Sequence, residues 1–76
     1  MDIHRFTIEM SKHALIRAWE RGITPDMIEA TIRGGIIEKF GKNNVRFIKQ
    51  YKRKTVMCID DIRGTTIVIV TVVIRE

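Results

Sequence analysis

The segment Thr65–Ile74 constrains the fold of this chain more than any other, because it consists of Thr, Ile and Val. β-Branched residues favour extended strands, and a run without polar alternation is typical of a strand covered on both faces. We therefore expect a central strand of a sheet here. The apolar part of the run, Ile67–Ile74, is much shorter than the ~20 residues that a membrane-spanning helix needs, so no membrane span is expected.

The chain of 76 residues is long enough for one domain, which we assign to residues 1–76. Its 45% hydrophobic and 30% charged residues are typical of soluble globular proteins and not of disordered ones. Met1–His4 lacks the basic and apolar regions of a signal peptide, and Cys58 has no second cysteine to pair with. We therefore expect a cytoplasmic protein. Because Cys58 and two histidines cannot supply four zinc ligands, neither a metal site nor a cofactor is predicted.

Two helices are predicted in the first half of the chain. Ser11 is a favourable N-cap for a helix over 12–21, which Gly22 ends. Thr24-Pro25-Asp26 begins a second helix, which ends at Gly34-Gly35. The first helix is expected to pack on the core through a broad apolar face that comprises Ala14, Leu15, Ile16, Ala18 and Trp19.

After the second helix, the spacing of apolar residues changes from helical to strand-like. Four strands are predicted, at Ile36–Phe40, Val45–Lys52, Thr55–Asp60 and Thr65–Ile74. Asp60–Gly64 is expected to form a hairpin turn, while Thr7–Met10 leads into the first helix and is not counted as a strand. This order predicts an α+β domain in which two N-terminal helices pack on a four-stranded antiparallel sheet.

The excess positive charge lies in one segment. The net charge is +5, and residues 42–54 carry six basic groups and no acidic group. A localised basic stretch beside Phe47 and Tyr51 indicates binding to a phosphate backbone. The alternative is a solvated edge strand and turn, in which lysines prevent edge-to-edge aggregation. The RNA-binding residues predicted in this segment are Arg46, Lys49, Tyr51, Lys52, Arg53 and Lys54.

His13 and Arg17 lie one helical turn apart, so their side chains are neighbours. Such a pair suits cleavage of a phosphodiester, because an imidazole can move the proton while a guanidinium stabilises charge on the phosphorane. Lys12, Arg17 and Arg21 favour the neutral imidazole that a general base requires, whereas Glu20 opposes this. The alternative is a solvated polar helix face without chemistry.

The remaining reactive side chains are assigned to structural roles. Cys58 lies within an apolar strand and is expected to be a buried core residue. Trp19 is expected to anchor the first helix on the sheet, and His4 to be a surface or packing residue. Asp60-Asp61 has no third carboxylate nearby in the sequence, so it is not a predicted Mg²⁺ site.

The segments Ser11–Arg17, with its His-Ala-x-x-Arg pattern, and Glu20–Thr24, with Arg-Gly-Ile, resemble the opening of domain-of-unknown-function family 4258. Thr71-Val72-Val73 resembles the closing strand of that family, with Val73 in place of an aromatic residue. The family has been grouped with the small RNase toxins of the RelE/ParE-like (BECR) fold. The resemblance implies two helices on four antiparallel strands and RNA cleavage without metal. It also implies a catalytic site of His13, Arg17 and Thr71, with Tyr51 as a substitute for the missing aromatic.

The sequence thus favours a metal-independent endoribonuclease or toxin-like domain that acts on RNA. The alternative is a non-catalytic RNA- or protein-binding module related to toxin–antitoxin proteins, with an antitoxin-type partner or a second copy of the chain. DNA binding is less favoured, because the second helix carries only Arg33 as a basic residue.

Overall fold

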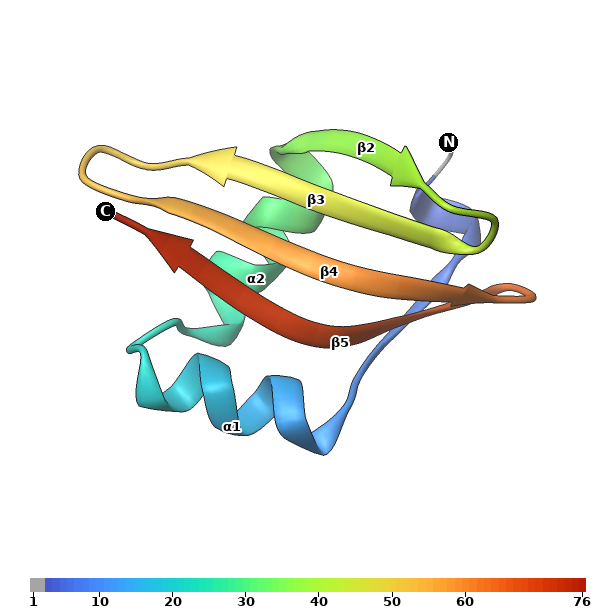
Figure 1. Ribbon diagram of the computed structural model, residues 1–76, viewed down its shortest axis with the longest axis horizontal. Coiled ribbons are helices and arrows are strands. Elements are labelled where there is room, and N and C mark those ends of the chain that lie inside the picture. Colours follow the sequence, from blue (N-terminus) through green and yellow to red (C-terminus); the bar gives the residue numbers. More distant parts are fainter. Residues whose placement is uncertain (1–2) are drawn as a thin grey trace.

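Two helices and a five-stranded mixed sheet form the structure, a computed structural model that describes residues 3–76 (Figure 1). A short 3₁₀ turn, Ile3–Arg5, precedes them. In chain order the elements are β1 (Thr7–Met10), α1 (Lys12–Glu20), α2 (Pro25–Gly34), β2 (Ile36–Phe40), β3 (Asn44–Gln50), β4 (Thr55–Arg63) and β5 (Thr66–Arg75).

The strand order in the sheet is β1-β5-β4-β3-β2, with β1 parallel to β5 and all other neighbours antiparallel. The predicted four-stranded antiparallel sheet of the RelE/ParE-like type is therefore wrong. The strand left out of that prediction is β1, which pairs Thr7 with Thr66 and Met10 with Ile69. Four residues are too few for a strand signal of their own, and the partner of β1 lies at the far end of the sequence.

The predicted helix ends are confirmed. The Ser11 hydroxyl accepts a hydrogen bond from the Ala14 N–H (3.1 Å) at the start of α1. The Thr24 hydroxyl accepts one from the Met27 N–H (3.2 Å), and Pro25 occupies the first turn of α2. α1 ends just before Gly22, whose φ of +69° is a left-handed conformation that glycine adopts without strain.

The core lies between the helices and one face of the sheet, which we call the covered face. Its fully buried strand residues are Val45, Phe47, Val56, Cys58, Ile67 and Ile69. α2 contributes Ile28, Thr31 and Ile32, and α1 contributes Ala14 and Ala18. Figure 1 shows α2 behind the sheet and α1 along β5, so neither helix covers the opposite face, which we call the open face. The expectation that Thr65–Ile74 is covered on both faces is therefore wrong.

Gly35 allows α2 to turn directly into β2. A Cβ atom at this position would collide with the carbonyl oxygens of Thr31 and Ile48, both of which belong to the backbone and cannot move aside. We therefore expect Gly35→Ala to lower the free energy of unfolding by about 2 kcal/mol. Gly34→Ala is the matched control, because a Cβ there would meet only the mobile ammonium of Lys49 at 3.4 Å. Urea denaturation of both variants checks the prediction, and equal stability of the two would contradict it.

Candidate nucleic-acid interface

His13 and Arg17 lie on one exposed flank of α1. Ala14 and Ala18 fix the orientation of the helix, because they are 0% and 2% exposed where α1 packs against β5. Because successive residues of a helix are 100° apart, His13 and Arg17 lie on the same side of α1, next to the Ala14–Ala18 stripe that contacts β5. Both residues are exposed. The structure therefore presents the predicted pair to solvent beside β5.

Thr71 lies on the open face of β5, opposite Ile59 of β4. The register between these strands shifts between Ile59 and Asp60, which leaves Val70 as an extra residue in β5. Ser11 donates hydrogen bonds to the carbonyls on this bulge, from its N–H to Ile69 (2.9 Å) and from its hydroxyl to Val70 (3.3 Å). The bulge thus fixes the start of α1 beside the strand that carries Thr71.

Most of the apolar face predicted for α1 is exposed. Trp19 is 85% exposed, Leu15 56% and Ile16 45%, so Trp19 is not a core anchor and that prediction is wrong. The reason is that α1 lies at the edge of the sheet formed by β1 and β5, where only a narrow stripe of small residues meets β5. Helical periodicity cannot tell how wide a stripe the partner element will cover.

The predicted basic segment is divided between three places. Arg46 lies on the open face, where its Nε pairs with the Glu38 carboxylate at 3.0 Å and its guanidinium stacks on the Phe40 ring, 5.0 Å from the centroid. Lys49 and Tyr51 lie toward α2, and Lys52, Arg53 and Lys54 lie in the turn between β3 and β4. Charge that is contiguous in the sequence is therefore not contiguous on the surface.

Tyr51 is held by α2. Its hydroxyl donates a hydrogen bond to the Met27 carbonyl at 2.9 Å and lies 3.2 Å from the Thr31 hydroxyl. The Lys49 ammonium lies 5.8 Å from the centre of the Tyr51 ring, near Gly34 at the C-terminal end of α2, which favours a cation. Thr71 is on the other face of the sheet, so Lys49 and Tyr51 do not belong to a common site with Thr71.

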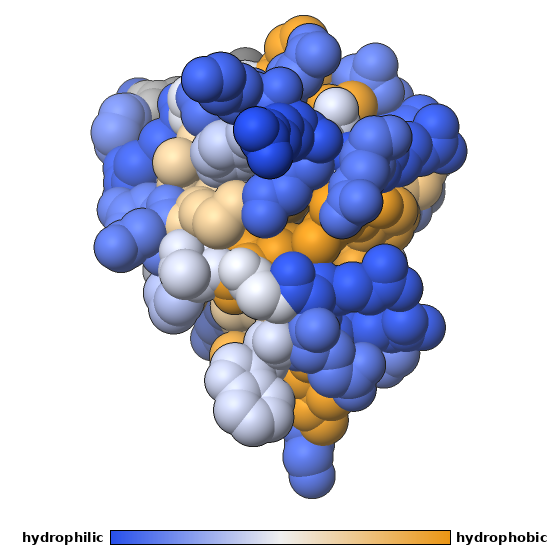
Figure 2. Space-filling model, turned by 90° about the vertical axis from the view of Figure 1, so that its left-hand side faces the viewer, coloured by the Kyte–Doolittle hydropathy of each residue, from blue (hydrophilic) through white to orange (hydrophobic). Residues whose placement is uncertain are grey.

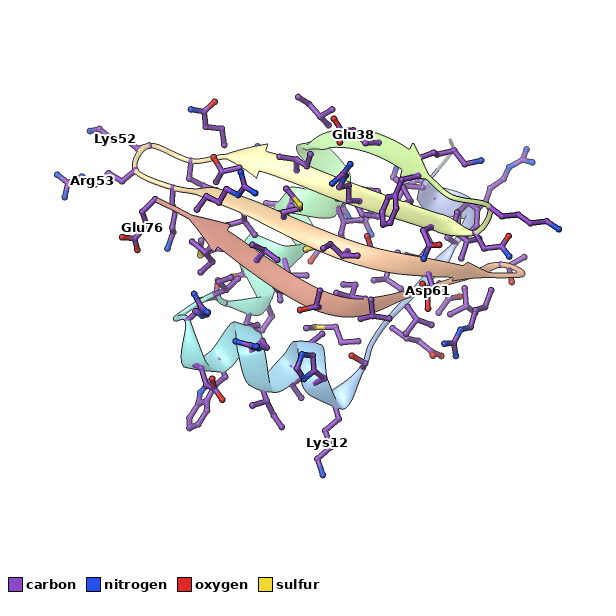
Figure 3. The ribbon with its side chains drawn as sticks, viewed as in Figure 1. Lys12, Glu38, Lys52, Arg53, Asp61 and Glu76 are labelled. Atoms are coloured by element: carbon purple, nitrogen blue, oxygen red, sulfur yellow. The ribbon has the colours of Figure 1, made fainter. Side chains whose placement is uncertain are left out.

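The β3–β4 turn, which we call the basic hairpin (residues 51–54), borders a hollow of about 320 Å³. The hollow is lined by Gln50, Tyr51, Lys52, Arg53, Lys54, Thr55, Arg75 and Glu76. Figure 3 shows Lys52 and Arg53 projecting from the tip of this hairpin, with Glu76 close by. Four cations and one acidic side chain surround the hollow, so it is electrostatically suited to a phosphate group.

Figure 2 views the molecule from the end that carries the basic hairpin. On this side, hydrophilic side chains lie above and below an apolar band. His13 and Arg17 do not line the hollow. Figure 3 shows Lys12, the residue before His13, at the start of α1 and away from the hairpin tip that carries Lys52 and Arg53.

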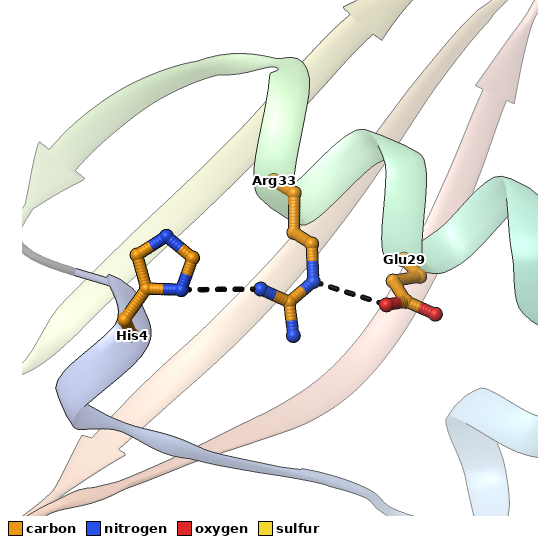
Figure 4. Close-up of polar contacts among 3 residues, drawn as sticks. All are labelled: His4, Glu29 and Arg33. Atoms are coloured by element: carbon orange, nitrogen blue, oxygen red, sulfur yellow. Dashed lines mark hydrogen bonds and ion pairs between the residues drawn. The ribbon is translucent and has the colours of Figure 1, made fainter.

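A second hollow, of about 290 Å³, lies between the N-terminal segment and α2, and was not predicted from the sequence. Its walls are apolar, with Phe6, Met10 and Ile69 among them. At its rim, Arg33 donates from Nε to Glu29 at 3.0 Å and its Nη1 lies 3.3 Å from His4 Nδ1 (Figure 4). His4 therefore lines this hollow together with Arg33 and Glu29.

Asp60 is a buried carboxyl group, not the turn residue that the sequence predicted. β4 continues to Arg63, and Asp60 is 0% exposed on the covered face, between Val45 and Ile69. Neither of its side-chain oxygens has a hydrogen-bond partner among residues 3–76. Burial, with the charge of Asp61 adding to it, raises the pKa of Asp60 from 3.8 to about 8.

Cys58 is fully buried two residues before Asp60, which confirms the prediction of a core cysteine. Burial raises the pKa of its thiol to about 12, and the nearby Asp60 adds to the effect. A thiol with such a pKa is not a nucleophile at neutral pH.

The described part of the chain holds no group of three or more His, Cys, Asp and Glu side chains that could bind a metal ion. None of its helices is long and apolar enough to cross a membrane.

The fold and the surface define a small α+β domain with a cationic hairpin and an exposed His–Arg pair on its first helix. Residues 10–76 match the family model described as Domain of unknown function (DUF4258), and the chain belongs to this family. No curated protein and no solved structure matches the chain.

Proposed function

We propose that this protein is an RNA-binding domain that cleaves RNA without a metal ion. The observation that carries the proposal is the basic hairpin, in which Lys52, Arg53 and Lys54 meet Arg75 around a hollow large enough for a phosphate group. Cations in this arrangement bind the phosphate backbone whatever the base sequence. The lone Cys58, which has no disulfide partner in the sequence, is compatible with a cytoplasmic protein.

Cleavage is assigned to the exposed flank of α1. His13 takes the proton of a ribose 2′-hydroxyl, whose oxygen attacks the adjacent phosphorus. The bond from phosphorus to the 5′-oxygen breaks, and this oxygen takes a proton from water and leaves as a hydroxyl group. Arg17, one turn away, stabilises the negative charge of the pentavalent phosphate. Thr71 on the adjoining β5 offers a hydroxyl to the same phosphate. The grouping of the DUF4258 family with small RNase toxins supports this assignment.

The binding part is tested with a triple variant of the basic hairpin, in which Lys52, Arg53 and Lys54 are replaced by Gln. We expect weaker binding to a fluorescent single-stranded RNA, because each lost phosphate contact flattens the dependence of log K on log [salt] by roughly 0.7. The slope should fall by about 2 for three contacts. Lys42→Gln is the control, since Lys42 comes from the same acid-free segment but lies in the β2–β3 turn, at the other end of β3. An unchanged salt slope in the triple variant rejects the hairpin as the binding site.

The second candidate is a non-catalytic RNA- or protein-binding module that acts with an antitoxin-type partner. The observation that favours it is the open face of the sheet, which no described helix covers and which carries exposed apolar side chains such as Ile36 (67% exposed). The two functions differ in one respect, since only the first requires His13.

A further inference from the structure

Apolar side chains form one continuous row across the open face of the sheet. The strand registers place Ile36 opposite Ile48, Ile48 opposite Met57, and Met57 opposite Val73. The row therefore crosses β2, β3, β4 and β5 at right angles to the strands. Ile36 at its end is 67% exposed, and the other three are partly exposed. The solvated face of an antiparallel sheet normally carries polar residues, so four adjoining apolar residues on this face indicate a surface that binds a partner.

The charges on the open face are separated along the strands. On one side of the apolar row, Arg75 and the basic hairpin follow. On the other side, Glu9 lies opposite Val68 of β5, and Asp61 lies opposite the same residue from β4. Asp61 also pairs with Arg63 at 3.5 Å, and Lys42 lies in the β2–β3 turn at this end, so the end with Glu9 is close to neutral while the end with the hairpin is strongly basic.

We infer that the open face binds a second copy of this chain, sheet on sheet, with the strands of the two copies running in opposite directions. A two-fold axis along the apolar row places the row of one copy on the row of the other. The same axis brings the basic end of each sheet over the nearly neutral end of its partner, so the two basic hairpins lie far apart. The surface is thus complementary to itself in hydrophobicity and avoids contact between like charges, as a two-fold interface requires.

The open face is large enough for a stable dimer. Four to five strands about 4.8 Å apart and five rows of outward side chains about 6.8 Å apart cover ~600 Å² per copy. Two copies would then bury ~1,200 Å², which lies at the lower end of the range for stable protein–protein interfaces.

Analytical ultracentrifugation of the full chain, without nucleic acid, tests this inference. We expect a concentration-dependent dimer whose dissociation constant rises about 30-fold or more in Met57→Lys, because a lysine there would be buried in the centre of the interface. Ile36→Lys is the second variant. Ile36 is so exposed that a lysine leaves the monomer folded, and circular dichroism verifies this for both variants.

Leu15→Lys is the control, since Leu15 is an exposed apolar residue of α1 outside the open face. It should leave the dissociation constant unchanged. The inference is overturned if the wild type stays monomeric at millimolar concentration, if both open-face variants keep the wild-type dissociation constant, or if Leu15→Lys is the variant that dissociates the dimer. None of these outcomes depends on RNA binding, so the test is separate from that of the proposed function.

Discussion

Replacement of Asp60 by valine is expected to raise the free energy of unfolding by about 4 kcal/mol at pH 7. The reason is that the carboxyl group lies in the core without a hydrogen-bond partner among the described residues. In the folded chain the carboxyl group keeps its proton up to a pH of about 8. In the unfolded chain the same group releases the proton near pH 3.8. Valine has no charge to neutralise and suits a strand.

The pH dependence follows from the direction of this shift. The pKa of Asp60 is higher in the folded chain than in the unfolded chain. Such a group contributes its full stability at a pH below its pKa in the unfolded chain, because both states then hold the proton. Between pH 3.8 and about 8 the unfolded chain releases the proton and the folded chain does not. The contribution of Asp60 to stability is therefore lost progressively as the pH rises through this window, and is constant above it.

Urea denaturation of wild type and variants between pH 4 and pH 9 measures this effect. The difference between wild type and Asp60→Val should grow with pH and level off above the folded pKa of about 8. Asp60→Asn is the control, because it removes the titration and keeps an unpartnered polar group. The Asp60→Asn variant should lack the pH dependence that comes from Asp60, and it should be less stable than the Asp60→Val variant. Parallel pH profiles of wild type and Asp60→Asn would show that Asp60 does not titrate in this window.

The second large effect is expected for His13→Ala, which should lower the rate of RNA cleavage by about 10²–10⁴-fold. The substitution removes the imidazole that is assigned to take the 2′-hydroxyl proton at neutral pH. The reaction should proceed in EDTA and should leave a 2′,3′-cyclic phosphate on the product, because the attacking oxygen belongs to the substrate. Gel analysis of a labelled RNA and mass spectrometry of its fragments measure both.

His4→Ala is the matched control for this experiment, because it removes the other histidine of the chain and leaves α1 intact. It should cleave RNA at the wild-type rate. Arg17→Lys, which retains the charge but not the fork of donors, should be slowed less than Arg17→Ala. Equal activity of wild type and His13→Ala, or no activity in either, would reject cleavage and leave the binding module as the function.

Several features of the fold could be predicted because they depend on neighbours in the sequence. Ser11 and Thr24 cap their helices with their own hydroxyl groups, and Gly22 ends α1 by its own conformation. The alternation in β3 similarly identified Val45 and Phe47 as residues of one face, and both are fully buried. These signals are local, so a single sequence contains them.

The remaining features depend on parts of the chain that are distant in sequence. β1 is a strand only because β5 pairs with it, and Trp19 is exposed because α1 lies at the margin of the sheet. Asp60 is buried by the course of β4 past the core, although Asp-Asp is typical of turns. Of the predicted site residues, His13 and Arg17 are both exposed on α1, whereas Arg46, Lys49 and the basic hairpin lie in three different places.

The parallel pairing of β1 with β5 has a consequence for synthesis of the protein on the ribosome. Ser11 and Val70, which meet at the bulge of β5, are 59 positions apart in the sequence. The first strand and α1 therefore leave the exit tunnel long before the strand that receives them exists. Contacts so distant along the chain slow folding, and we expect a nascent chain that stops before β5 to remain protease-sensitive throughout its length.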